Sequence, residues 1–135
     1  GRCSTDIAGT LAARAKTYAM CGGVTGQSSE MVCCYALLRN TAVVTVATEG
    51  GQGASFGGVN GSATTGNLTS CFAIVDGRVT LSCDGAPASF GGVTGVVAAA
   101  MQARAKSLNG CYALVGGTVS TEGTPATTNM AAWSA

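Results

Sequence analysis

The chain has 135 residues, with seven basic and six acidic side chains that nearly cancel in charge. Only 10% of the residues are charged, so the sequence lacks the basic surface that nucleic acids and anionic membranes attract. The hydrophobic share of 47% is enough for a packed core and argues against disorder. We therefore expect a single domain over residues 1–135, with no nucleic-acid partner and no membrane span.

The first predicted element is an amphipathic helix over residues 5–19. Polar residues before the first apolar position can cap such a helix. Its apolar residues recur at spacings of four, four and three, which is the pattern of one helix face: Ile7, Leu11, Ala15 and Tyr18.

Two β-hairpins are predicted next, over residues 32–48 and 70–84. They begin alike, at Cys34-Tyr35-Ala36 and Cys71-Phe72-Ala73, and each returns through a strand rich in Val and Thr. Asp76-Gly77 suits the tight turn of the second hairpin, because such turns need positive φ. A shared glycine-rich linker follows each hairpin, at Phe56-Gly57-Gly58-Val59-Asn60-Gly61 and Phe90-Gly91-Gly92-Val93-Thr94-Gly95.

A second helix over residues 94–108 and a third hairpin over residues 110–121 repeat these elements. A shift of ninety positions places Ala13-Arg14-Ala15-Lys16 on Ala103-Arg104-Ala105-Lys106 without a gap. The hairpin starts at Cys111-Tyr112-Ala113, which matches the two earlier repeats.

This order predicts an α+β fold: two short amphipathic helices packed on an antiparallel sheet of up to six strands, built from three repeated β-hairpins. An all-β meander with helical decoration is the alternative. Five aromatic residues hold repeated positions and are predicted to lie in the core: Tyr35, Phe56, Phe72, Phe90 and Tyr112.

Seven cysteines predict a disulfide-stabilised domain with one thiol left for a bridge to another chain. Adjacent residues of a strand point to opposite faces, so Cys33 and Cys34 would have separate partners. The disulfide candidates are all seven: Cys3, Cys21, Cys33, Cys34, Cys71, Cys83 and Cys111.

The sequence predicts no enzyme, no cofactor and no metal site. It has no His to activate a cysteine nucleophile or to ligate zinc, and no Cys-x-x-Cys pair. Glu49, Asp84 and Glu122 each precede Gly in equivalent parts of the repeat, so turn chemistry explains them. Lys16 and Lys106 are interpreted as residues of solvated helix faces.

Three further residues are candidates for contact or modification. Asn60 and Asn67 lie in N-glycosylation sequons within a polar segment. Trp133, near the end of the chain, either packs on its own domain or contacts a neighbour.

We expect a non-enzymatic structural subunit, extracellular or at the cell surface, that self-assembles into a filament, coat or surface layer. Low charge, an odd cysteine and short strands with open edges favour association between copies. The alternatives are a secreted carbohydrate- or protein-binding module and a small α+β sensor or regulatory domain. The single Cys-Cys pair is loosely similar to hydrophobins, but that family carries a second pair, so no family is assigned.

Overall fold

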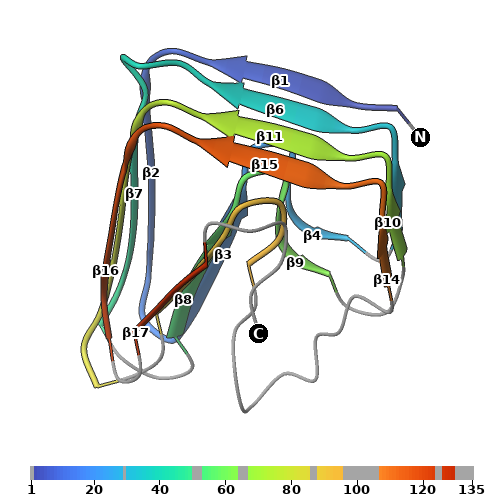
Figure 1. Cartoon of the computed structure of the whole chain (residues 1–135). Coiled ribbons are helices and arrows are strands. Elements are labelled where there is room, and N and C mark those ends of the chain that lie inside the picture. The colour runs from blue at the N-terminus through green and yellow to red at the C-terminus, as the bar shows by residue number, and fades with distance from the viewer. Residues whose placement is uncertain are drawn as a thin grey trace.

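The chain forms a coil of parallel β-strands, and no described residue is helical (Figure 1). This computed structural model describes residues 2–28, 30–49, 53–63, 67–85, 88–95, 107–123 and 126–129. Each turn of the coil is called a rung here, and successive rungs stack through parallel strand pairs. The described architecture is therefore a parallel β-solenoid.

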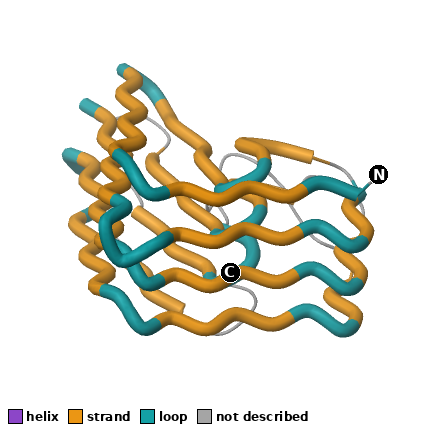
Figure 2. Tube along the Cα trace, turned by 90° about the horizontal axis from the view of Figure 1, so that it is seen from above, coloured by secondary structure: helices purple, strands orange, loops and turns teal. Residues whose placement is uncertain are grey.

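The strands fall into four rungs, as Figure 2 shows from above. The first rung contains β1 (Ser4–Ile7), β2 (Thr10–Ala15), β3 (Tyr18–Gly22) and β4 (Thr25–Ser28). The second contains β5 (Met31–Val32), β6 (Tyr35–Leu38), β7 (Val43–Thr48), β8 (Gly53–Gly57) and β9 (Asn60–Ala63). The third contains β10 (Asn67–Thr69), β11 (Phe72–Val75), β12 (Arg78–Cys83) and β13 (Ala88–Gly91). The fourth contains β14 (Ser107–Asn109), β15 (Tyr112–Val115), β16 (Thr118–Glu122) and β17 (Ala126–Asn129).

Three four-stranded sheets form the main faces of the solenoid, each with one strand from every rung. Sheet A has the order β1-β6-β11-β15, sheet B has β2-β7-β12-β16, and sheet C has β3-β8-β13-β17. Smaller sheets join β5, β10 and β14, and β4 with β9. Consequently, the first and fourth rungs supply the two outer edges of all three main sheets.

Side chains alternate between the inside and the outside of the coil, as the strand geometry requires. On β7, Val44 and Val46 are fully buried whereas Val43 is 38% exposed. Inside sheet C, the rings of Phe56 and Phe90 stack with centroids 6.0 Å apart, and both are fully buried. The core prediction for these two residues is confirmed.

Close backbone packing explains why Ala and Gly recur in the repeat. Gly58 lies in the corner between β8 and β9, opposite the inner side of sheet A. A Cβ atom at Gly58 would clash with the Cβ of Ala73 and with the carbonyl oxygen of Gly92. Small residues are therefore required at both positions, and the solenoid is narrow here.

The predicted helix over residues 5–19 is wrong, because this segment forms β1, β2 and the start of β3. Ile7 and Leu11 lie on different strands, separated by a corner, so their spacing of four is not helical. In β2, the inward residues alternate with exposed ones, with Leu11 inside and Arg14 outside. Most of the helix predicted over 94–108 falls on residues 96–106, outside the described residues. At its ends, Thr94 bridges Asn60 and Ser107 begins β14.

The hairpins predicted over 32–48, 70–84 and 110–121 are also wrong, and with them the antiparallel sheet and the α+β class. The two halves of each segment join different sheets, so the Asp76-Gly77 turn is a corner and not a hairpin turn. Each repeat pairs in parallel with the same segment of the next rung. Phe72 thus pairs with both Tyr35 and Tyr112.

Candidate functional site

Four cysteines form a column at the corner before sheet A, one in each rung: Cys3, Cys34, Cys71 and Cys111. Each is followed by residues that pair in register, and backbone bonds join the column. The amide of Phe72 donates to the carbonyl of Cys34, and that of Tyr112 to Cys71, at 3.0 and 3.1 Å. The side chains of Cys34 and Cys71 are buried in the core.

The thiols of Cys34, Cys71 and Cys111 hydrogen-bond to backbone carbonyl oxygens at this corner. Cys71 donates to the carbonyl oxygen of Thr69, with Sγ and O 3.4 Å apart, and Cys34 makes the same bond to Val32 at 3.4 Å. Burial raises the pKa of Cys71 to about 11, and negative charge on Cys34 and Cys111 would raise it as well. A thiol with such a pKa stays protonated at neutral pH, which favours structural hydrogen bonding over nucleophilic attack.

No disulfide joins any of the seven cysteines, all of which lie in the described part of the chain. The disulfide-stabilised fold is therefore not found in this structure. Cys33 is exposed with a φ of 53°, whereas Cys34 is buried; both lie in the corner between β5 and β6, so the strand alternation behind the prediction does not apply, and neither forms a disulfide. Cys71 lies at the corner before β11, whereas Cys83 ends β12 in sheet B and accepts a hydrogen bond from the hydroxyl of Thr48 at 2.6 Å.

An aromatic ladder runs along the outer face of sheet A. Tyr35 and Phe72 stack with centroids 4.9 Å apart, and Phe72 and Tyr112 stack at 5.0 Å. The prediction that these three residues lie in the core is wrong: Tyr35 is 37% and Tyr112 is 49% exposed. Because the rings lie face to face, their flat surfaces cover one another, which disfavours stacking of sugars or bases on the ladder.

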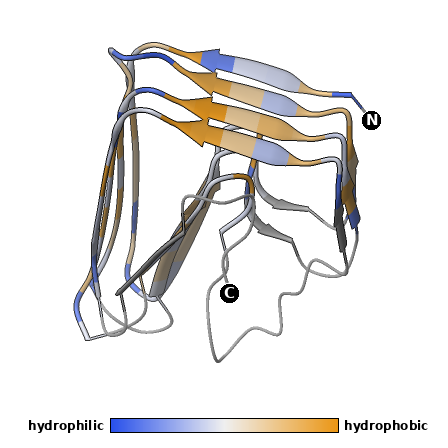
Figure 3. Ribbon diagram, viewed as in Figure 1, coloured by the Kyte–Doolittle hydropathy of each residue, from blue (hydrophilic) through white to orange (hydrophobic). Residues whose placement is uncertain are grey.

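Aliphatic side chains extend this outer face beside the ladder. Leu37 pairs with Ile74, and Ile74 with Leu114, which is 59% exposed. Figure 3 shows the apolar character of β6, β11 and β15. The outer face of sheet A is therefore apolar from the second rung to the fourth.

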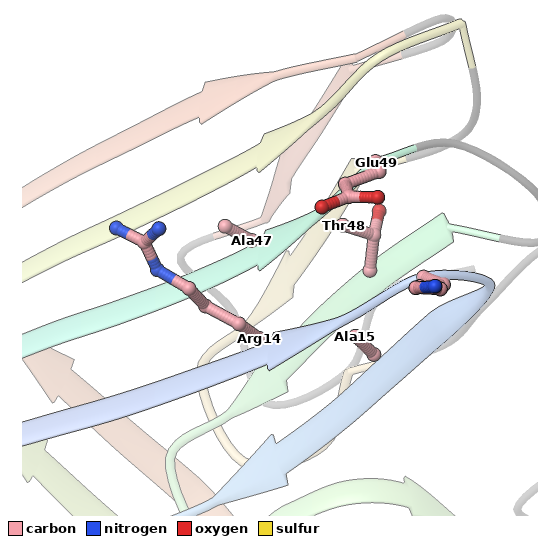
Figure 4. A pocket seen from close by; sticks show the side chains of 6 residues that line it. Arg14, Ala15, Ala47, Thr48 and Glu49 are labelled. Carbon is pink, nitrogen blue, oxygen red and sulfur yellow. The ribbon is translucent and has the colours of Figure 1, made fainter.

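A surface hollow of 330 Å³ lies where β2 and β7 end (Figure 4). Its charged residues are Arg14, Lys16 and Glu49, and all three are exposed. Figure 4 shows Arg14 extending over the outer side of sheet B from β2. Exposed charges of this kind act mainly as surface charge, because water and salt screen them.

The residues predicted for glycosylation or contact do not form a common site in the described part of the chain. Asn60 begins β9 and is fully buried, which leaves no room for a glycan, whereas Asn67 at the start of β10 is exposed. Trp133 lies outside the described residues. Within the described residues, no three metal-ligating side chains gather and no helix is long and apolar enough to cross a membrane.

The two end rungs leave the hydrophobic core partly open. The partly buried apolar residues that pack against the core lie only in the first and fourth rungs of the described chain. They are Ile7, Leu11, Ala13, Ala15, Cys21 and Val24 in the first rung, and Cys111, Ala113, Val115 and Val119 in the fourth. Their counterparts in the inner rungs, such as Val44 and Val79, are fully buried.

Sequence reasoning missed two features of this arrangement. A further copy of the glycine-rich corner stands at Gly22-Gly23-Val24-Thr25-Gly26, and shifts of 35 and then 34 positions along the sequence would have found it. The repeat of about one rung, 35 and then 34 residues long, can therefore be recognised in the sequence. Glu122 was equated with Asp84, but it pairs with Ser82 and belongs to the outer face of sheet B.

No protein-family model, curated protein or solved structure matches this chain.

Proposed function

We propose that this chain is a non-enzymatic structural subunit that self-associates through the ends of its solenoid. The observation that carries the proposal is the partial exposure of core residues at both end rungs. Ile7 and Leu11 at one end, and Val115 and Val119 at the other, would bury apolar surface if a second copy stacked there.

The backbone supports the same association. The outer strands of the first and fourth rungs have neighbours on one side only among the described strands. Such edges carry backbone amide and carbonyl groups that can pair with a strand of another chain. Pairing between unlike ends adds further copies without closing, so the expected product is a filament.

Sedimentation velocity and negative-stain microscopy over a range of concentrations test this proposal. Elongated assemblies that grow with concentration are expected. Val119→Lys puts a charge inside an end rung and should suppress growth, whereas Thr80→Lys, on the outer face of the third rung, should not. Thermal unfolding checks that both variants fold. A protein that stays monomeric at the highest concentration would contradict the proposal.

We further propose that the subunit acts outside the cell or at its surface, in keeping with its seven cysteines and low charge. The intact mass of freshly isolated protein, measured before and after reduction, tests this. A bridge between two copies at an exposed cysteine, Cys3 or Cys33, would support the location, and seven reduced thiols in the isolated protein would count against it.

A protein-binding module is the second candidate, and the apolar outer face of sheet A favours it. Exposed side chains such as Tyr112 and Leu114 gather there, and apolar surface of this kind often marks an interaction site. This candidate predicts a monomer that binds an apolar fluorescent dye. Leu114→Asp should then reduce dye binding without lowering the melting temperature.

A further inference from the structure

One column of residues on the outer face of sheet B is oppositely charged at its two ends. Arg14 on β2 pairs with Ala47, Ala47 pairs with Ser82, and Ser82 pairs with Glu122 on β16. Both charged residues are exposed. The column therefore presents a guanidinium on the first rung and a carboxylate on the fourth, with uncharged residues between them.

A second copy stacked head to tail would bring these two charges together. If the fourth rung of one copy continues the register of the solenoid onto the first rung of the next, Glu122 becomes the cross-strand neighbour of Arg14. Strands in a sheet lie about 4.8 Å apart, and opposite charges at neighbouring positions attract. A head-to-head arrangement would set first rung against first rung, so Arg14 would have no Glu122 opposite it.

The core columns fit the same register. Ile7 stands in one column with Leu38, Val75 and Val115, and Leu11 in another with Val44, Val79 and Val119. Head-to-tail stacking would therefore set Val115 against Ile7 and Val119 against Leu11. Asp6, the acid on the outer face of β1, is already held by Arg39 in two hydrogen bonds of 2.8 and 2.7 Å.

We infer that copies of this chain stack head to tail in register, with Glu122 of one copy paired to Arg14 of the next. This inference rests on the proposed function and adds the polarity and the register of the contact. The partner is a second copy of the chain. The charge pair favours the head-to-tail arrangement because only unlike ends bring the guanidinium and the carboxylate together.

Charge reversal at each end tests the register. Arg14→Glu and Glu122→Arg should each raise the concentration at which assembly begins by about tenfold, since a like-charge contact replaces an attractive one. An equimolar mixture of the two variants should assemble like the wild type, because every contact between alternating copies again joins a carboxylate to a guanidinium. Arg78→Glu, on the outer face of an inner rung, makes the same charge change as Arg14→Glu and should leave the threshold unchanged.

The outcomes separate the inference from the proposed function. Recovery in the mixture, measured by light scattering at low ionic strength, supports the register. Assembly of the wild type with no shift in either single variant overturns the register and leaves self-association standing. A wild type that never assembles overturns both. If a reversed variant does not fold, Arg14→Gln and Glu122→Gln each test the shift of the single variant, which should be smaller; their mixture restores the ion pair at only every second contact.

Discussion

The thiol of Cys71 in the third rung points at the carbonyl oxygen of Met31 in the second, with Sγ and O 3.7 Å apart. The same sulfur lies 3.4 Å from the carbonyl oxygen of Thr69 in its own rung. One neutral side chain therefore contacts the backbone of two successive rungs. Cys111 repeats the arrangement one rung further on, with Sγ 3.3 Å from the carbonyl oxygen of Leu68.

Stability should fall at high pH because of this thiol. Burial raises the pKa of Cys71 from 9.0 to about 11, so the folded protein holds the proton more tightly than the unfolded chain. The stabilisation is fully present below pH 9.0 and is lost as the pH rises to about 11. Urea unfolding between these limits should show a smaller pH dependence for Cys71→Ala than for the wild type. Equal pH dependence would contradict the assignment.

Alkylation should distinguish the two adjacent cysteines. Cys33 is exposed and Cys34 is buried, so iodoacetamide at about pH 8 should modify Cys33 much faster than Cys34 in the folded protein. Peptide mapping after short exposure measures this difference. In urea the two rates should become similar, and similar rates in the native protein would contradict the fold at this corner.

Phe56→Ala should destabilise the protein strongly. The ring is fully buried and stacks on Phe90, so its loss leaves a cavity and costs about 3–5 kcal/mol in the free energy of unfolding. Tyr18→Ala, at a 36% exposed position, is the control and should cost much less. Chemical denaturation of both variants gives the comparison, and equal losses would argue against a core position for Phe56.

Gly58→Ala should be poorly tolerated, whereas Gly9→Ala should be nearly neutral. The new methyl group at Gly58 would clash with Ala73 and Gly92, while nothing lies within 4 Å of a Cβ at Gly9. We expect a loss of about 2–3 kcal/mol at Gly58 from overpacking. Melting temperatures measure the difference, and a stable Gly58→Ala protein would mean that the corner is wider than described.

Removing the middle ring of the aromatic ladder should cost more stability than removing an end ring. Phe72 stacks on two rings and Tyr112 on one, and each stack contributes about 0.5–1.5 kcal/mol. Phe72→Ala should therefore cost about twice as much stability as Tyr112→Ala. Equilibrium unfolding tests this ratio, and equal costs would show that the stacks add little.

The repeat and many of its turn residues can be recognised from residue identities alone. The equivalence of Cys34-Tyr35-Ala36 with Cys71-Phe72-Ala73 appears in the structure as matched register, and Phe56 and Phe90 lie in the core as predicted. These features are local, because they are read from residue identities that recur along the chain. Cys33 and Cys34 differ in exposure for another reason than the predicted strand alternation, because Cys33 has a φ of 53° in a corner between two strands.

Which segments pair with one another follows only from the folded chain as a whole. A strand bonds equally well to its return strand or to the same segment of the next repeat, because backbone groups carry no sequence information, and Asp76-Gly77 can form either a hairpin turn or a corner. Phe72 and Ala73 are both apolar enough to face inward, and the prediction that the ring of Phe72 lies in the core is wrong. The close approach of Gly58 to Ala73 decides which of them faces inward, since only the small side chain fits inside and the ring must point outward. That contact joins residues distant in sequence, which is why no local pattern predicted it.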